Sequence, residues 1–313
     1  MTPPRLLLVA KPWRGGLACY LQRALAGYRA ASVTWLASYP HGAREALHYR
    51  LSRRAWREAR VDGINGASRE AAVFVNLPPL ACAIAPHPGN VLWLTDAAAV
   101  TPADLAPFAR VFVSDPGYAA QIAAAAGSRF AGVLPFACDP ALHAPAGGEA
   151  RRDVCFIGNR DSKRDAHLRA LLACDVSATV VGNYFANHPL FWSNPSRFRP
   201  RVAVSGMGRI YARHRLALNV HAAVVREGTN MRTFECAAYG IAQVVEHRRG
   251  LDDLFDPQHE LVSYEQPEEL AQLLHALVAD AARRTRLATA ARARALAQHT
   301  YAHRVAQMLL GLL

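Results

Sequence analysis

The sequence has almost no lysine, no closely spaced cysteine pair and no long apolar run near its start, and each absence excludes a class of protein. The six cysteines are scattered without a Cys-x-x-Cys pair, so we expect buried, reduced thiols and neither a zinc site nor a disulfide framework. The apolar run at 6–10 is far shorter than a signal sequence or a membrane span requires. We therefore expect a cytoplasmic protein without a transmembrane segment.

The positive charge of the chain comes almost entirely from arginine. The formal net charge is +12, yet Lys11 and Lys163 are the only lysines and no block of five like charges occurs. We interpret the arginines mainly as solvated helix faces, because they lie beside alanines in helix-like segments. A basic surface for nucleic acid, anionic lipid or an acidic polymer is the alternative. Aromatic residues are not interleaved with the basic ones along one face, so we expect no nucleic-acid partner.

Short apolar runs alternate with helical patterns, which predicts an α/β protein with parallel sheets. A chain of 313 residues is long enough for two domains of ordinary size. In the first, 1–137, we predict strands at 5–10, 32–37, 72–76, 91–95, 111–114 and 132–134, and helices at 17–28, 44–60 and 118–126. Residues 135–152 are rich in proline, glycine and alanine, which is typical of an interdomain linker.

The second predicted domain covers 153–298 and has the same alternation. We predict strands at 154–158, 177–181, 218–221 and 241–245, and helices at 165–172, 211–217, 231–239, 267–277 and 281–298. Residues 183–201 have no clear period and are predicted to form a loop. A further apolar helix at 301–312 lies in the last predicted segment, 299–313.

The segment 226–240 holds the most informative pattern. Glu227 and Glu235 stand eight positions apart, with a glycine-containing turn between them. Asn230 is placed to cap the helix 231–239 and Gly240 to end it. A loop that ends at a helix N-terminus offers backbone N–H groups and a partial positive charge, which suit a phosphate. A carboxylate just over one turn into that helix can accept hydrogen bonds from a ribose diol, so the pattern indicates a nucleotide-sugar site.

This segment resembles the Glu-x7-Glu signature of retaining GT-B glycosyltransferases. With Ala237, Ala238 and Gly240 it more narrowly resembles the spore-maturation (CgeB-like) branch of those enzymes. Residues 154–160 are similar to the first strand and turn of that family's donor domain, and 299–304 to its closing helix. The resemblance covers about residues 90–313. It implies GT-B architecture, with two Rossmann-like parallel-sheet domains facing a central cleft and a last helix that packs back on the N-terminal domain.

The resemblance also implies an activity. We expect a metal-independent retaining glycosyltransferase that moves a sugar from a nucleotide-diphosphate donor, of the UDP-hexose type, to an acceptor. The acceptor, whether glycan, protein, lipid or small molecule, is left open, and so is peripheral contact with a membrane. Apart from the nucleotide sugar as co-substrate we expect no cofactor. A degenerate, non-catalytic GT-B binding module and a basic nucleic-acid-binding protein are the alternatives; the first would be expected to lose the two glutamates.

Within the resembling segments each site residue receives an expected role. Glu235 would grip the ribose, and Glu227 would lie near the sugar or brace its loop. Arg164, and after it Lys163, would take the charge of the leaving phosphate. Arg232 would bind the donor sugar or form a salt bridge with Glu227. The predicted catalytic set is Glu227, Arg164 and Lys163, and the predicted donor-binding set is Glu235, Gly228, Thr229, Asn230, Met231, Arg232, Arg160, Gly158 and Asn159.

Three residues of the first predicted domain are candidates for the acceptor side. Gly15 and Gly16 follow the first strand and permit close backbone approach, although an ordinary strand-to-helix turn explains them equally well. Asp96 follows the strand 91–95 and would orient the acceptor or cap the next helix. Asp252 and Asp253 are adjacent and not spaced as Asp-x-Asp, so no metal is implied.

Overall fold

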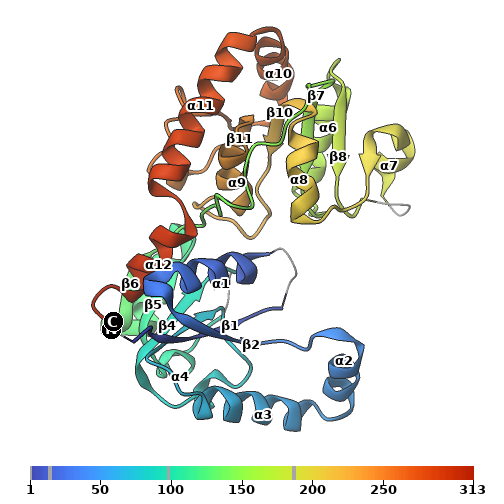
Figure 1. Ribbon diagram of the computed structural model, residues 1–313. Coiled ribbons are helices and arrows are strands. Elements are labelled where there is room, and N and C mark those ends of the chain that lie inside the picture. The colour runs from blue at the N-terminus through green and yellow to red at the C-terminus, as the bar shows by residue number, and fades with distance from the viewer. Residues whose placement is uncertain (1, 13–15, 97–98, 185–187) are drawn as a thin grey trace. The chain divides into compact units, whose positions relative to one another are not determined.

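The computed structural model describes residues 2–12, 16–96, 99–184 and 188–313 of the chain. The chain divides into two compact units, one made of Met1–Pro135 with Tyr301–Leu313 and the other of Phe136–Thr300. Each unit contains a six-stranded sheet in which all the strand pairs of the described residues are parallel, with helices packed on its faces (Figure 1). The predicted α/β class is confirmed.

The sheet of the first unit has the strand order β2-β1-β3-β4-β5-β6. Its strands are β1 (Arg5–Ala10), β2 (Ser32–Ala37), β3 (Ala71–Val75), β4 (His87–Leu94), β5 (Phe108–Val113) and β6 (Phe130–Val133). Its helices are α1 (Leu17–Gly27), α2 (Gly42–Leu51), α3 (Arg53–Gly66), α4 (Pro102–Leu105), α5 (Ala119–Ala126) and α12 (Tyr301–Leu309). Strand β3 and the second half of β4, 91–94, are continuous buried apolar runs because helices cover both faces of a parallel sheet. The strand order reverses between β1 and β3, which makes a topological switch point there.

The sheet of the second unit has the strand order β12-β11-β10-β7-β8-β9. Its strands are β7 (Arg152–Ile157), β8 (Ala178–Val181), β9 (Phe198–Arg199), β10 (His214–Asn219), β11 (Ala242–Glu246) and β12 (Val262–Tyr264). Its helices are α6 (Arg164–Ala173), α7 (Pro189–Ser193), α8 (Val204–Tyr211), α9 (Met231–Tyr239), α10 (Leu270–Ala279) and α11 (Ala281–Gln298). The chain runs from β7 out to β9 and then crosses to β10, so the switch point lies between β7 and β10.

Three of the expected elements are wrong. The helix expected at 44–60 is two helices, because Ser52 has φ −140° and ψ 58°, outside the helical region. The helix expected at 211–217 is the end of α8 followed by most of β10, because a short buried apolar run fits a strand as well as a helix. The loop expected at 183–201 contains α7 and the two-residue strand β9. Strand β12 is an addition to the expected set.

The last helix, α12, packs within the first unit. Tyr301 is buried, with its ring centroid 5.3 Å from that of Tyr20 and 6.5 Å from that of Trp93. Arg304 Nε donates to Pro135 O at 2.8 Å, and Arg110 Nη1 donates to Met308 O at 3.3 Å. Helix α12 therefore completes the hydrophobic core of the first unit, although the second unit separates it from the rest of that unit in the sequence.

The expectation of buried thiols holds for four of the six cysteines: Cys138, Cys155, Cys174 and Cys236 are buried, Cys19 is half-buried and Cys82 is exposed. In the part of the chain that the structure describes, no helix combines the length and the apolar composition needed to cross a bilayer.

Candidate functional site

Two loops of the second unit are joined at the switch point between β7 and β10, the place where open α/β sheets bind ligands. Asp161, after β7, accepts hydrogen bonds from Lys163 N at 3.0 Å and from Ala223 N at 3.2 Å. Arg164 Nε donates to Val220 O at 3.0 Å and its Nη1 to Asn159 O at 2.8 Å. One carboxylate and one guanidinium thus hold the loop after β7 against the loop after β10.

The carboxyl ends of β7 and β8 approach too closely for side chains. A Cβ built on Gly182 would lie 2.0 Å from Gly158 O, and one on Gly158 would lie 2.6 Å from the Phe156 ring. Beyond these glycines Asn183 Oδ1 accepts from Arg160 N at 2.6 Å. Gly158 therefore leaves backbone, and no side chain, at the start of the loop that carries the predicted basic residues.

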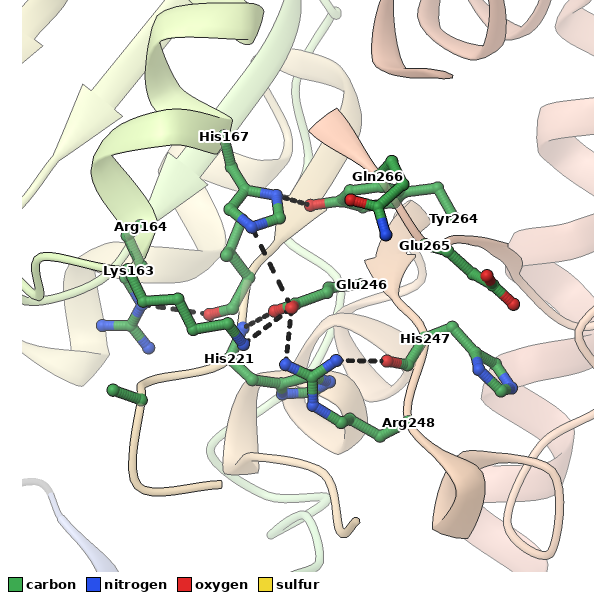
Figure 2. A network of polar contacts seen from close by, with 12 residues as sticks. Lys163, Arg164, His167, His221, Glu246, His247, Arg248, Tyr264, Glu265 and Gln266 are labelled. Carbon is green, nitrogen blue, oxygen red and sulfur yellow. Dashed lines mark hydrogen bonds and ion pairs between the residues drawn. The ribbon is translucent and has the colours of Figure 1, made fainter. Parts of the chain in front are cut away.

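A buried carboxylate gathers cations beside these loops (Figure 2). Glu246, the last residue of β11, is 2% exposed, and its Oε1 lies 2.6 Å from both Lys163 Nζ and Arg248 Nη2. Its Oε2 accepts a hydrogen bond from His221 N at 2.9 Å. Burial raises the pKa of Glu246, but the hydrogen bond and charge of Lys163, with Arg248, outweigh it and leave the pKa below its ordinary value. Glu246 is therefore ionised and fixes both cations.

Two histidines border this carboxylate. His167 Nε2 lies 3.9 Å from Glu246 Oε1, and its Nδ1 is 3.0 Å from the Tyr264 hydroxyl oxygen. His221 is fully buried, and neither ring nitrogen has a hydrogen-bond partner among the described residues. Burial lowers the pKa of His221 to about 3, so its ring is neutral near pH 7. A neutral imidazole has one donor nitrogen and one acceptor nitrogen.

The predicted turn and helix have the expected bounds, but their polar side chains are used differently. Helix α9 begins at Met231, and Gly240 ends it with φ 72°. Asn230 occupies the N-cap position without a side-chain capping bond; its Nδ2 donates instead to Asn219 Oδ1 at 2.9 Å. Asn219 Nδ2 donates to Thr233 Oγ1 at 2.9 Å, and the Thr229 and Thr233 hydroxyls are hydrogen-bonded. These bonds tie the start of α9 to the end of β10.

Glu235 is not the accessible carboxylate that we expected. It is fully buried, as is every residue of α9 from Thr233 to Tyr239. Arg232 Nη1 donates to its Oε2, and His143 Nε2 lies 3.8 Å from its Oε1. Arg232 is thus paired with a carboxylate three positions along the same helix, a partner that the sequence analysis did not consider. Glu227 is half-buried, and its backbone O accepts from Gly250 N at 2.7 Å.

The remaining predicted donor residues lie along the same two loops. Asn159 and Arg160 are exposed, Gly158 and Met231 are half-buried, and Gly228 and Thr229 are buried. The structure thus brings Lys163 and Arg164 to the switch point, while Glu235 is enclosed by the body of the second unit.

The predicted acceptor-side residues belong to the first unit. Asp96 Oδ2 accepts a hydrogen bond from Asn76 Nδ2 at 3.1 Å and lies 3.9 Å from Lys11 Nζ. Asn76 has φ 60°, a left-handed conformation in which its side-chain oxygen also accepts from Thr95 N at 2.7 Å. Gly16 precedes α1 at its N-cap position, and Gly15 lies outside the described residues.

Sequence reasoning missed several residues of this polar cluster, namely Asp161, His167, His221, Glu246 and Arg248. The available signal was the Glu246-His247-Arg248 triplet directly after a buried apolar strand, at the carboxyl end where ligands bind. Among the described residues, no group of three or more His, Cys, Asp or Glu side chains could hold a metal ion.

Comparison with known proteins adds a family match to part of the chain. Residues 163–310 match the model of a family described as glycosyl transferase-like. A search of curated proteins found no match.

Solved structures of the same architecture match almost the whole chain. Sucrose-phosphate synthase (tll1590) from Thermosynechococcus elongatus is 13% identical, with a TM-score of 0.68 over 97% of each chain. Anabaena Alr3699/HepE in complex with UDP and glucose is 13% identical, with a TM-score of 0.65 over 98% of this chain and 100% of that one. A glycosyltransferase from Rickettsia africae is 10% identical, with a TM-score of 0.69 over 99% and 100%. The protein has the GT-B fold, as the resemblance implies.

Proposed function

We propose that the protein is a glycosyltransferase that transfers a sugar from a nucleotide-diphosphate donor, of the UDP-hexose type, to an acceptor. The observation that carries this proposal is the polar cluster at the switch point of the second unit. There Lys163, Arg164 and Arg248 gather beside the buried ring of His221, which has no hydrogen-bond partner in the described part of the chain. The cluster begins within the residues that match the glycosyl transferase-like family, and a GT-B neighbour was solved with UDP and glucose.

Arg164 is the first candidate to stabilise the leaving diphosphate. Two of its nitrogens donate to carbonyl oxygens, while Nη2 has no hydrogen-bond partner among the described residues. Lys163 is the second candidate, because its positive charge is already paired with the carboxylate of Glu246. The backbone amides of 228–231, before the N-terminus of α9, would add further donors. Together these groups would take the charge that develops as the bond to the sugar breaks.

Glu235 stays our candidate for the ribose. Its Oε1 has no hydrogen-bond partner among the described residues, although the side chain is fully buried. Access to a ribose would require Arg232 or the segment around His143 to move aside. Glu227, on the loop before α9, would lie nearer the sugar.

We further propose that transfer proceeds with retention and without a metal ion. In retention the departing phosphate can accept the proton of the acceptor hydroxyl on the same face of the sugar, so no side chain need act as general base. Asp96 would orient the acceptor. The cations at the switch point would replace a metal as partners of the diphosphate.

A thermal-shift screen with UDP, GDP, dTDP and their sugars tests donor binding. A ligand present at a hundred times its Kd stabilises the folded state by about 2.7 kcal/mol, so the matching nucleotide should raise the midpoint clearly. Arg164→Met should weaken nucleotide affinity about tenfold to a hundredfold, because charge-assisted hydrogen bonds contribute about 1.5–3 kcal/mol. Glu235→Gln should weaken nucleotide affinity by a similar factor, because the ribose hydroxyls would lose a charged acceptor. Glu45→Gln, a carboxylate on the first unit, is the control and should not change it.

No shift with any nucleotide sugar would overturn the proposed function. Unchanged nucleotide affinity in a folded Glu235→Gln protein would overturn only the assignment of Glu235 to the ribose. The full burial of Glu235 favours one second candidate, a non-catalytic GT-B binding module, which would bind a nucleotide yet neither transfer nor hydrolyse its sugar.

Mechanism is tested by following the anomer of the product by NMR, with saturating donor and with EDTA present. We expect a retained anomer and activity that EDTA leaves unchanged. Arg164→Ala should slow the chemical step about a hundredfold or more, by analogy with lost oxyanion donors. Asp96→Ala should impair it less. An inverted product, or greater damage from Asp96→Ala, would make Asp96 a general base and retention wrong.

A further inference from the structure

Helix α2 contains no buried residue although it has 10 residues and packs against α3. Its inner face is polar and aromatic: Glu45 Oε1 accepts from Arg60 at 2.7 Å, and the Tyr49 ring meets the Trp56 ring edge-on with centroids 5.2 Å apart. Figure 1 shows α2 at the margin of the first unit, beyond strand β2 and beside α3. These contacts fix which side of α2 points away from its own unit.

The outer face of α2 carries two large exposed apolar side chains among polar ones. Leu47 and Leu51, one turn apart, are 58% and 76% exposed. By helical spacing Arg44 and His48 lie on the same stripe, and both are exposed. An amphipathic helix normally turns its apolar stripe toward the core that stabilises it. Here the two leucines point outward and leave apolar surface exposed to water.

The surroundings of this stripe are basic. Residues 42–66 contain six arginines and three acidic residues. Two of the acids are engaged in ion pairs at 2.7 Å, Glu45 with Arg60 and Glu58 with Arg54. Arg44 and Arg50 are exposed on the same helix as the leucines, and Arg53, also exposed, lies over the Tyr49 ring at 5.0 Å from its centroid. An excess of positive charge near exposed apolar side chains complements a surface that is negative outside and apolar beneath.

We propose that the outer face of α2 binds the surface of an anionic lipid bilayer. Leu47 and Leu51 would enter the boundary between headgroups and acyl chains, and the neighbouring arginines would contact anionic headgroups. A nucleic acid would engage the arginines but would leave the two leucines exposed to water. The proposal does not depend on glycosyl transfer, because it rests on residues of the first unit alone.

Flotation of the full-length protein with vesicles tests this surface. The protein should bind vesicles of equal parts phosphatidylcholine and phosphatidylglycerol, and not vesicles of phosphatidylcholine alone. Leu47→Ser with Leu51→Ser should lower the partition coefficient by about tenfold or more. Arg44→Ser with Arg50→Ser should do the same and should weaken the dependence on salt. Leu310→Ser is the matched control, because Leu310 is 72% exposed just after α12, and it should change nothing.

Exposed leucines contribute little to folding, so each variant should keep the wild-type circular dichroism spectrum and thermal midpoint. Absence of binding by the wild-type protein, or equal binding by the double leucine variant, would overturn the proposal. A DNA duplex serves as the second probe. Tight binding to the duplex that the leucine variant retains, without binding to vesicles, would assign the surface to nucleic acid and equally overturn it.

Discussion

One carboxylate determines which cations of the second unit are available to an anionic ligand. Glu246 binds Lys163 and Arg248 through the same oxygen, so a phosphate that approached Lys163 would compete with a buried, ionised partner. Arg164 donates only to carbonyl oxygens among the described residues, so no carboxylate is hydrogen-bonded to its guanidinium. Removing Glu246 would leave two half-buried cations close together without their partner, which is costly. We infer that Glu246 positions the cluster while Arg164 carries most of its attraction for anions.

His221 should make folding stability depend on acidic pH. Burial lowers its folded-state pKa to about 3 from 6.5, although Glu246 opposes the shift; Arg248 and Lys163 lower it further. The unfolded chain gains a proton as pH falls below 6.5 and the folded chain does not. His221 thus stabilises the fold above pH 6.5, and the stability is lost progressively from there down to about pH 3. Between pH 7.5 and 5.0 the loss is about 2 kcal/mol, at about 1.4 kcal/mol per pH unit.

Urea unfolding of the wild type and of His221→Gln at these two pH values measures this contribution. Burial also lowers the pKa of His143, His167 and His214, so both proteins should lose stability in acid. Only the difference between them belongs to His221, and the wild type should lose about 2 kcal/mol more. Equal losses would mean that the ring takes up a proton in the folded state.

Local signals predicted those elements whose ends are marked by particular residues. Helix α9 lies at 231–239 as expected, because Asn230 and Gly240 mark its ends. The strand expected at 218–221 begins earlier, as β10 at His214–Asn219, because this short buried run has no period that separates strand from helix. Pairing with β7 and β11 makes this segment a strand, and those partners are distant in the sequence, so a local window does not contain them.

The residues of the candidate site likewise fall into those that a local segment predicts and those that depend on contacts between distant segments. Lys163 and Arg164 could be predicted because they follow a strand and a turn in one continuous segment. Glu246 also stands at a strand end, but its contacts with Lys163 and His221 could not be predicted, because those residues come from other loops. The burial of Glu235 depends on Arg232 packing along α9 and on His143 from the segment before β7.

The junction of β7 and β8 should tolerate no side chain. In Gly182→Ala the new Cβ would meet Gly158 O at 2.0 Å, so backbone must shift on one of the two strands. We expect a loss of about 3 kcal/mol in the free energy of unfolding, measured with urea. Gly66→Ala is the control, because a Cβ there meets nothing within 4 Å and the residue ends helix α3. It should leave stability unchanged or raise it by up to about 1 kcal/mol. Similar losses in both would contradict the close approach.

The whole molecule is a chain that leaves its first unit at Pro135 and returns to it at Tyr301. All of the second unit is therefore an insertion between the first sheet and its last helix. The returning helix is held by aromatic packing on Tyr20 and Trp93 and by Arg304 on Pro135 O. The stability of the first unit thus depends on residues that follow the whole second unit in the sequence.

Tyr301→Ala should weaken the first unit selectively. Deleting a buried aromatic side chain costs about 3–5 kcal/mol, and here the lost contacts lie on Tyr20 and Trp93. Hydrogen exchange followed by mass spectrometry should show faster exchange in α1 and β4, with β10 and β11 unchanged. Leu310→Ala, at an exposed position just after the same helix, is the matched control and should exchange like the wild type. Faster exchange throughout both sheets would mean that the two units unfold as one, and unchanged exchange in α1 would mean that α12 does not stabilise the first unit.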